Sequence, residues 1–415
     1  MTDSLINRAQ ILLQQNRFEE AGNLLKDILR QDPNNVHVLA MLAQVQLQQD
    51  NVLGAEQLIN DAIGLSPDTD YLYFIKARVE LQNEKYDEAE KNLELSIQIN
   101  PYDADYFALW ASVKLARKQY AKALELADEA LEVDPENLLG LNTRSTALLK
   151  LNRKEDSFTT IEGALSHDPN NAYTHSNYGW ALLEKGDHKK ALEHFREALK
   201  NDPGMVHAQA GMGEALKAKY LFYRVFLRYS FFMSNLASKN QWAIILGFYF
   251  GSRLLNYLAK TYPSLQVVLL PLLVLMAVFA FSTWVITPLS NLFLRLNPYG
   301  KYLLNKEEKL SSNFVGGSLS VCILGLVLYF TTSSENYLLI ALFGFAMMVP
   351  FGAMFLKKKN YLVIYAGALF LTGIAGISTA FMTGELYNVF NVIFVVGFIA
   401  FQWIANFARI KQGNI

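Results

Sequence analysis

The sequence predicts an all-α protein in two parts: a superhelical solenoid of paired helices, then a bundle of transmembrane helices. A proline recurs every 34 residues through the first half, and long apolar stretches fill the second. The charge also changes sign. Residues 1–219 hold 23 Lys and Arg against 34 Asp and Glu, a net charge of −11, whereas residues 220–415 hold 14 against 4, a net of +10. We therefore expect a domain boundary near residue 220.

The first half is a repeat array. Its prolines follow Asp, Ser or Asn and keep one spacing, at Pro33, Pro67, Pro101, Pro135, Pro169 and Pro203. Small residues recur in two fixed columns, at Ala9, Ala43, Ala77, Ala111, Ser145 and Gly179, and at Ala21, Ala55, Ala89, Ala123, Ser157 and Ala191. Small side chains let two helices cross closely, and a proline cannot continue the helix before it. The pattern predicts one pair of helices per period.

These columns resemble the tetratricopeptide repeat, whose 34-residue period and small-residue and proline positions match six consecutive units in residues 1–219, before a capping helix. The resemblance implies a concave groove, lined by the first helix of each unit, that binds peptides or partner domains. The repeat's register gives the expected groove contacts as Tyr71, Phe74, Arg78, Asn142, Tyr173 and Trp180.

The competing interpretation of these aromatic residues is that they pack between helices, because aromatic side chains at helical spacing also build cores. Trp180 and Arg78 are favoured as contacts, since amphipathic anchors dominate binding surfaces. The best-known variant of the family clamps chaperone tails with a Lys and an Asn four residues apart. Here Ile6 and Gln10 hold those positions, which argues against that partner. The acidic charge argues against nucleic acid.

Residues 220–240 begin with an aromatic and apolar segment that carries Arg224 and Arg228 on one helical face. Such a segment is typical of an amphipathic helix that lies in the headgroup region of a membrane. A helix that caps the exposed core of the last repeat is the alternative, and the two roles are compatible.

Residues 241–415 contain about six apolar stretches, each close to the roughly 20 residues that span a hydrocarbon core. They lie near 241–259, 265–289, 314–332, 337–356, 361–381 and 386–407. Alternate connections carry nine basic residues: Arg295, Lys301, Lys306, Lys309, Lys357, Lys358, Lys359, Arg409 and Lys411. The other connections carry one basic residue, Lys260, together with Glu335 and Glu385. Four spans, with the first pair re-entrant, is the alternative count.

The positive-inside rule places the basic connections and both termini in the cytoplasm. The absence of a signal peptide in the first twenty residues agrees with this orientation. The expected location is therefore the inner (plasma) membrane of a bacterium, crossed several times, with the N-terminal repeats and the C-terminus in the cytoplasm.

Polar side chains are few inside the spans. Arg253 is the one clear charge there, and Asn388 and Asn391 are amides of the last stretch. An intramembrane charge is a functional hypothesis, although Arg253 can also snorkel to the interface and the amides can bond across helices. The spans contain no His, and Cys322 is the only cysteine. We therefore predict no catalytic residue, no metal site, no cofactor and no enzyme activity.

The favoured hypothesis is a non-catalytic scaffold that recruits or organises protein partners on the cytoplasmic face of a membrane. A transporter, channel or lipid-handling protein with regulatory repeats is the alternative, because six spans exceed what anchoring requires. A third hypothesis is a subunit of a larger complex, in which the spans bind other membrane subunits or a second copy of the chain.

Overall fold

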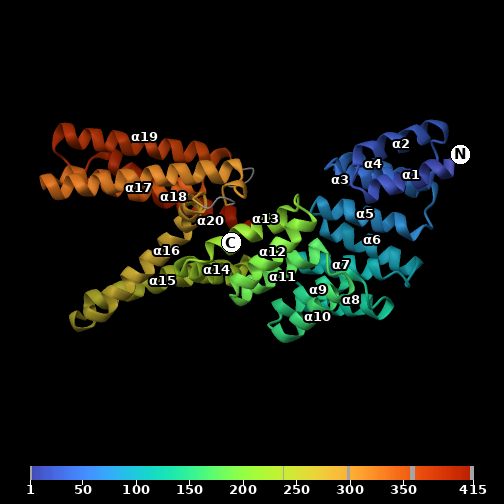
Figure 1. The fold of residues 1–415 in the computed structure, drawn as a ribbon. Helices are drawn as coiled ribbons and strands as arrows, with labels where there is room; N and C mark the ends of the chain where they lie inside the picture. Colours follow the sequence, from blue (N-terminus) through green and yellow to red (C-terminus); the bar gives the residue numbers. More distant parts are fainter. Residues whose placement is uncertain (1, 237, 297–299, 356–359, 412–415) are drawn as a thin grey trace. The chain divides into compact units, whose positions relative to one another are not determined.

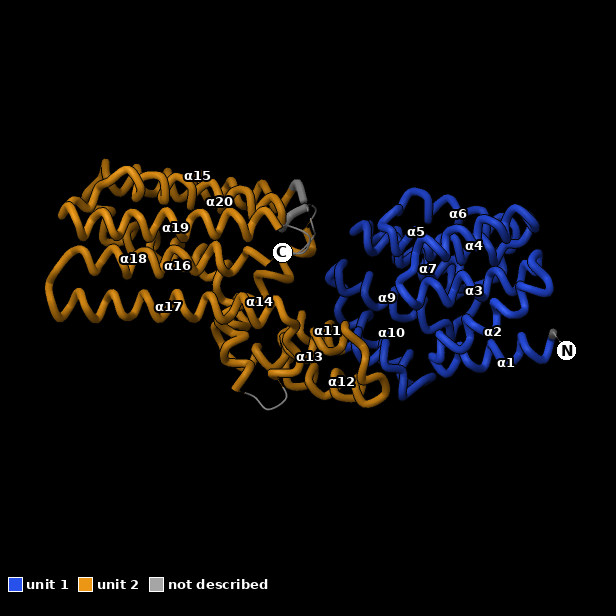
Figure 2. Tube along the Cα trace, turned by 90° about the horizontal axis from the view of Figure 1, so that it is seen from above, with its two compact units in different colours: residues 1–178 blue, residues 179–415 orange. Residues whose placement is uncertain are grey.

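The computed structural model describes residues 2–236, 238–296, 300–355 and 360–411. These residues form α-helices and two short 3-10 helices and contain no strand, which confirms the predicted all-α fold class. Contacts divide the chain into two compact units, residues 1–178 and 179–415 (Figure 2). The change of charge near residue 220 lies inside the second unit, because the last repeat packs with the helices that follow it.

The first unit consists of stacked helix pairs (Figure 1). Its helices are α1 (Thr2–Gln14), α2 (Phe18–Gln31), α3 (Val36–Gln48), α4 (Val52–Leu65), α5 (Asp70–Gln82), α6 (Tyr86–Ile99), α7 (Ala104–Ala116), α8 (Tyr120–Val133), α9 (Leu138–Lys150), α10 (Lys154–His167) and the first half of α11 (Ala172–Lys185). The first helices of successive pairs begin at residues 36, 70, 104, 138 and 172, so each pair advances by the 34 residues of the sequence period.

The two columns of small residues lie where the helices of a pair cross. Ala9, Ala43, Ala21 and Ala55 are 0% exposed, as are most other members of the columns. In the fifth pair the columns touch, because the Ser145 hydroxyl donates to the Ser157 carbonyl at 3.0 Å. Small side chains at these positions therefore set how closely the two helices approach.

The second unit begins within α11 and contains the end of the repeats together with the apolar helices (Figure 2). Its further helices are α12 (His188–Asn201), α13 (Val206–Lys217), α14 (Leu221–Ser234), α15 (Ser238–Thr261), α16 (Gln266–Leu294), α17 (Lys306–Thr332), α18 (Glu335–Ala353), α19 (Asn360–Thr383) and α20 (Val389–Lys411). The 3-10 helices Pro263–Leu265 and Gly300–Tyr302 precede α16 and α17.

Five helices among the described residues are long and apolar enough to cross a membrane, namely α16 with its preceding 3-10 turn, α17, α18, α19 and α20. The first predicted stretch forms α15, whose 24 residues are long enough to cross. It falls short in composition, because Arg253, Asn256 and Lys260 interrupt its apolar sequence. The count therefore differs from the expected six at this helix alone.

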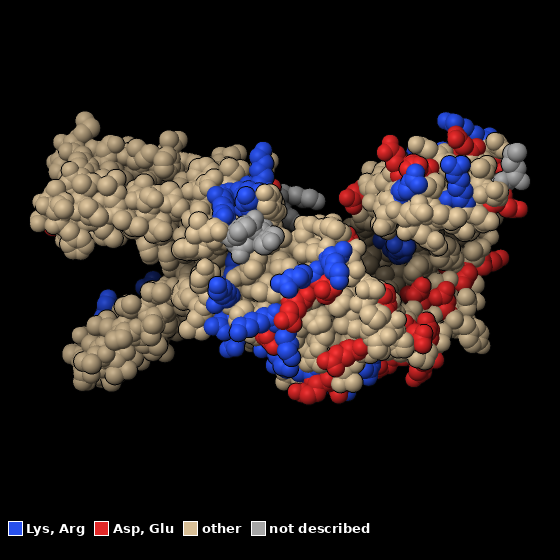
Figure 3. All heavy atoms as spheres, in the orientation of Figure 1, with Lys and Arg blue, Asp and Glu red and all other residues tan. Residues whose placement is uncertain are grey.

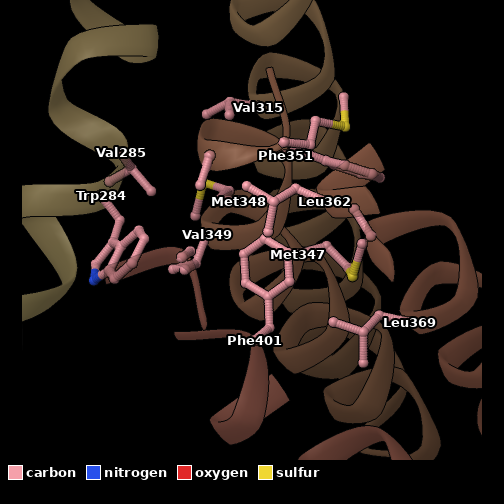
Figure 4. Close-up of a cluster of buried hydrophobic side chains, with 14 of the residues drawn as sticks. Trp284, Val285, Val315, Met347, Met348, Val349, Phe351, Leu362, Leu369 and Phe401 are labelled. Atoms are coloured by element: carbon pink, nitrogen blue, oxygen red, sulfur yellow. The ribbon is translucent and has the colours of Figure 1, made fainter. Parts of the chain in front are cut away.

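Side chains from five helices form the core of this bundle (Figure 4). Trp284 of α16 and Val315 of α17 meet Met347 of α18, and Leu362 of α19 and Phe401 of α20 complete the cluster. Of these five residues, Trp284 is 8% exposed and the other four are 0% exposed. The outer faces are apolar as well, with Val267 81% and Phe330 78% exposed. Helices that are apolar all round are typical of membrane spans.

Successive apolar helices of the second unit run in opposite directions (Figure 1). The turns at Pro263–Leu265, at 333–334 and at 384–388 lie at one end, whereas the connection from α16 to α17 and the end of α20 lie at the other. On the face drawn in Figure 3, Lys and Arg gather at the latter end. At the opposite end, Glu335 begins α18. Lys357, Lys358 and Lys359 lie outside the described residues.

Candidate functional site

Three of the predicted groove residues share one face of α5, which we call the α5 face: Tyr71, Phe74 and Arg78. The rings of Tyr71 and Phe74 stack at 5.9 Å, and the Arg78 guanidinium lies 6.0 Å from the Phe74 ring. Tyr71 is 38% exposed, and its hydroxyl accepts a hydrogen bond of 2.9 Å from the Gln44 amide. Residues three and seven apart lie on the same side of a helix, so these groups form a continuous aromatic and basic strip.

Tyr106 of α7 packs against the buried side of this strip. Its ring lies 5.2 Å from Phe74, and its hydroxyl donates to Asp70 at 2.8 Å. Burial and the Asp70 carboxylate raise the pKa of Tyr106. Burial by itself raises the pKa of Asp70, but hydrogen bonds from Asn100 and Tyr106 outweigh it and lower that pKa. Sequence reasoning did not select Tyr106, although it is the one large aromatic in a column otherwise held by Val38, Leu72, Gly140, Thr174 and Ala208.

A hollow of about 390 Å³ adjoins Arg78. Leu47 of α3 and Leu109 of α7 line it together with Gln82, whose amide donates to Asp50 at 2.9 Å. The hollow therefore crosses three successive first helices. Its lining combines three leucines with two amides, the Asp50 carboxylate and the Arg78 guanidinium.

The other predicted groove residues of the first unit differ in accessibility. Tyr173 is 47% exposed, whereas Asn142 is 1% exposed. The Asn142 amide donates to the Thr174 hydroxyl at 2.9 Å, and its carbonyl oxygen accepts from Asn177 at 2.9 Å. Asn142 therefore joins neighbouring first helices and presents no polar group to a partner.

Trp180, in the second unit, is half-buried. Its ring meets Phe231 of α14 edge-on at 6.3 Å and Phe195 at 5.8 Å, and its indole donates to the His207 carbonyl at 3.2 Å. Asn235 at the end of α14 also donates to Glu184 at 2.9 Å. The predicted groove contact Trp180 therefore packs against the chain's own α14.

Arg224 and Arg228, predicted to face lipid headgroups, lie on the α14 side that meets the last repeat. Both line a small hollow with Leu183 and Gly186, the turn residue between α11 and α12. This placement matches the capping alternative. The other side of α14 meets α16, where Tyr229 packs edge-on against Phe279 at 5.0 Å.

A buried polar network joins α13, α14 and α16. Lys217 is 4% exposed and pairs with Glu214, and its ammonium lies 3.5 Å from the Asn291 side-chain oxygen. Tyr223 of α14 is 2% exposed and donates to the second Glu214 oxygen at 2.5 Å. Burial raises the pKa of Tyr223, and the Glu214 charge raises it further. Glu214 therefore serves two buried partners at once.

Beside this network lies a cavity of about 710 Å³, which we call the α16 cavity. Its walls come from Trp180 of α11, from α13, α14, α15 and α16, from the start of α17, and from the ends of α18 and α20. Asn406 of α20 is among the lining residues. A cavity of this volume lies within the range of small-molecule sites, roughly 300–1,000 Å³. Nothing in the sequence pattern indicated it, because its walls come from segments far apart in the chain.

The predicted intramembrane polar residues take separate places. Arg253 is exposed on α15, with its guanidinium 5.8 Å from the Tyr249 ring, and it does not line the α16 cavity. Asn388 donates to the Gly376 carbonyl of α19 at 2.9 Å, and Asn391 donates to the Leu386 carbonyl at 2.9 Å. Both amides therefore hold the turn between α19 and α20. Within the described residues, no group of three His, Cys, Asp or Glu is arranged to hold a metal ion.

His207, next to Trp180, gives the last repeat a pH dependence. Burial lowers the pKa of His207 below its ordinary value of 6.5. The unfolded chain therefore binds the proton at a higher pH than the folded chain. As a result, the contribution of neutral His207 to the free energy of unfolding is fully present above pH 6.5 and is lost as the pH falls toward the folded-state pKa. We expect the thermal midpoint of His207→Gln to fall less than that of the wild type between about pH 7 and 5. Parallel curves for the two proteins would contradict this assignment.

The paired helices and the partly exposed α5 face define a helical-repeat protein of the protein-interaction class. Family models described as tetratricopeptide repeat match residues 12–79, 71–103 and 172–205. The chain therefore carries tetratricopeptide repeats, as the sequence columns predicted. A search of curated proteins found no match.

Several solved structures resemble the repeat part. YrrB, described as a TPR protein with an unusual peptide-binding site, is 18% identical over 45% of this chain and 96% of its own, with a TM-score of 0.32. PilF of Pseudomonas aeruginosa is 19% identical over 51% and 97%, with a TM-score of 0.41. A tetratricopeptide repeat protein of Parabacteroides merdae is 15% identical over 55% and 90%, with a TM-score of 0.42. At these values the matches add no argument about what this chain binds.

Proposed function

We propose that this protein is a membrane-anchored scaffold that recruits or organises protein partners on the cytoplasmic face of a bacterial inner membrane. The observation that carries the proposal is the α5 face, a strip on an array of protein-binding repeats in which Tyr71 is exposed and Phe74 and Arg78 are half-buried. Five apolar helices in the same chain support the anchor.

The anchor crosses the membrane six times in this proposal, with α15 as the least apolar span. The 24 residues of α15 extend about 36 Å along the helix axis, which exceeds the ~30 Å hydrocarbon core. Arg253 lies eight residues before the end of α15, within snorkelling distance of the interface. An even number of crossings puts the repeats and the end of α20 on one side, and the basic connections assign that side to the cytoplasm.

The repeats bind, in this proposal, an extended protein segment along the α5 face and its hollow. An aromatic or aliphatic side chain of the partner packs on Tyr71 and Phe74, and a carboxylate pairs with Arg78. Trp180 is left out of this interface because it packs against Phe231 of α14 and lines the α16 cavity. Asp50 also lines the hollow, where it accepts from Gln82, so Arg78 is the group that would pair with an acidic partner residue.

The charge of Arg78 tests this interface. Partners are captured from native membranes with the full-length protein and identified by mass spectrometry, and their affinity for the variants is then measured. Arg78→Glu should weaken binding at least about tenfold, because it places a like charge opposite the partner's carboxylate. Arg30→Glu is the matched control, since Arg30 is an exposed arginine on α2 that pairs with Asp27. Equal affinities for the two variants would remove the α5 face from the proposal.

A further inference from the structure

We infer that the α16 cavity binds an amphiphile with an ammonium head group, such as an aminophospholipid, with its tail along α16 and its head beside Glu308. The inference goes beyond partner recruitment and rests on the proposal that α16 spans a bilayer. The first observation is the shape of the cavity. The α16 residues that line it lie on one face of the helix, three or four positions apart: Ala280, Thr283, Trp284, Thr287, Pro288 and Asn291.

The α16 wall has the length of one leaflet. Ala280 and Asn291 are eleven residues apart, which corresponds to about 16 Å along a helix. This is close to half of the ~30 Å hydrocarbon core. The wall therefore matches a hydrocarbon tail lying along the helix from the membrane surface toward the middle of the bilayer.

Polarity changes along the cavity in the same direction. At the deep end, Ile245 and Phe248 of α15 line it with Phe279, and the two rings lie 6.5 Å apart. At the other end, which carries the basic connections, Glu214 and Glu308 line it. An apolar end in the spans and a polar end at the surface is the arrangement that an amphiphile has in a leaflet.

The polar end selects the head group by charge. The lining residues include the carboxylates of Glu214, Glu307 and Glu308, and neither Lys nor Arg is among the described residues that line the cavity. Glu214 is already shared by Lys217 and Tyr223. Glu307 and Glu308 therefore remain as the counter-charges for a bound cation. The aromatic face of Trp284 also favours an ammonium group, whereas the Tyr223 ring already has the Lys217 ammonium 5.1 Å from its centre.

Two variants test the tail and the head separately. Ala280→Trp adds an indole inside the cavity and should lower binding of the amphiphile at least about tenfold. Val278→Trp is its control, because Val278 is 51% exposed and lies on the opposite side of α16. Glu308→Gln removes a charge and retains the capping box at the start of α17, since Gln serves that box as Glu does. We expect it to lower binding roughly fivefold. Glu335→Gln, at the start of α18, is its control.

The measurement is native mass spectrometry of the full-length protein in mild detergent, titrated with phosphatidylethanolamine, phosphatidylglycerol of the same chains, or dodecylamine. Binding of phosphatidylethanolamine or dodecylamine in preference to phosphatidylglycerol, with the two losses above, supports the inference, and the preferred ammonium compound distinguishes a lipid from a free amine. Equal binding of all three compounds, or binding unchanged in both variants, overturns it. Because detergent replaces the bilayer here, release of the chain from membranes by salt would defeat the anchor proposal without affecting this result.

Discussion

Replacing Glu214 by alanine lowers the free energy of unfolding by about 3 kcal/mol or more. The change removes the counter-ion of Lys217, which is 4% exposed, and the acceptor of the buried Tyr223 hydroxyl. A buried charge that loses its partner keeps its desolvation cost without the compensating attraction. We expect a large fall in the thermal midpoint of the full-length protein in detergent, measured by intrinsic fluorescence and by the loss of the monodisperse peak in size-exclusion chromatography.

Two comparison variants isolate the cause. Glu197→Ala removes the partner of Lys200 in a pair of the same spacing on α12, but that pair is exposed, with 69% of the lysine side chain accessible. An exposed pair contributes roughly 0–1 kcal/mol, so the midpoint should change little. The double variant Glu214→Leu, Lys217→Met removes both charges and should recover most of the loss. Similar midpoints for Glu214→Ala and Glu197→Ala would show that the network at α13, α14 and α16 does not stabilise this junction.

Replacing Gly211 by alanine destabilises the last repeat by about 1–3 kcal/mol, although alanine is the better helix former. A Cβ at Gly211 would lie 2.2 Å from two atoms of the Phe195 ring, which is 0% exposed. The ring cannot move away freely, because a Cβ at Gly179 on α11 would lie 2.7 Å from the same edge of the ring and Trp180 packs against it at 5.8 Å. Thermal unfolding of the full-length variant measures the effect.

Gly163→Ala is the matched control for Gly211→Ala. Gly163 lies inside α10, and a Cβ there would meet nothing within 4 Å. Alanine should therefore stabilise the helix by about 0.5–1 kcal/mol through its higher helix propensity. The prediction is a difference of sign between the two substitutions. If both raise the midpoint, the packing of Phe195 between α11 and α13 is looser than the structure indicates.

The repeat array could be predicted because each helix pair is encoded within one period. Alanines such as Ala43 and Ala55 lie where the register puts them, both 0% exposed. Tyr71, Phe74 and Arg78 also share a face, because a register that places one residue of a regular helix places its neighbours three and seven positions on. Local periodicity was sufficient for these features.

The junction after the repeats could not be predicted in the same way. The spacing of Arg224 and Arg228 indicated one face of a helix, but only tertiary contacts determine that this face meets the turn at Gly186. The repeat's register predicted that Trp180 contacts a partner, but Phe231 of α14, some fifty residues further along the chain, packs against its ring. The α16 cavity likewise depends on contacts between distant segments. Periodicity reports which residues share a face and not what that face meets.

The side of the membrane on which each segment lies tests the central claim most directly. Single cysteines in place of Tyr102 in the repeats, Tyr302 in the basic connection and Tyr387 in the last turn, which are 85%, 76% and 92% exposed, are introduced into a Cys322→Ser background and treated with a membrane-impermeant maleimide. The account predicts labelling of the Tyr387→Cys protein in intact cells, and of the Tyr102→Cys and Tyr302→Cys proteins only after permeabilisation. Labelling of the Tyr102→Cys protein in intact cells, or of all three proteins on one side, would contradict it.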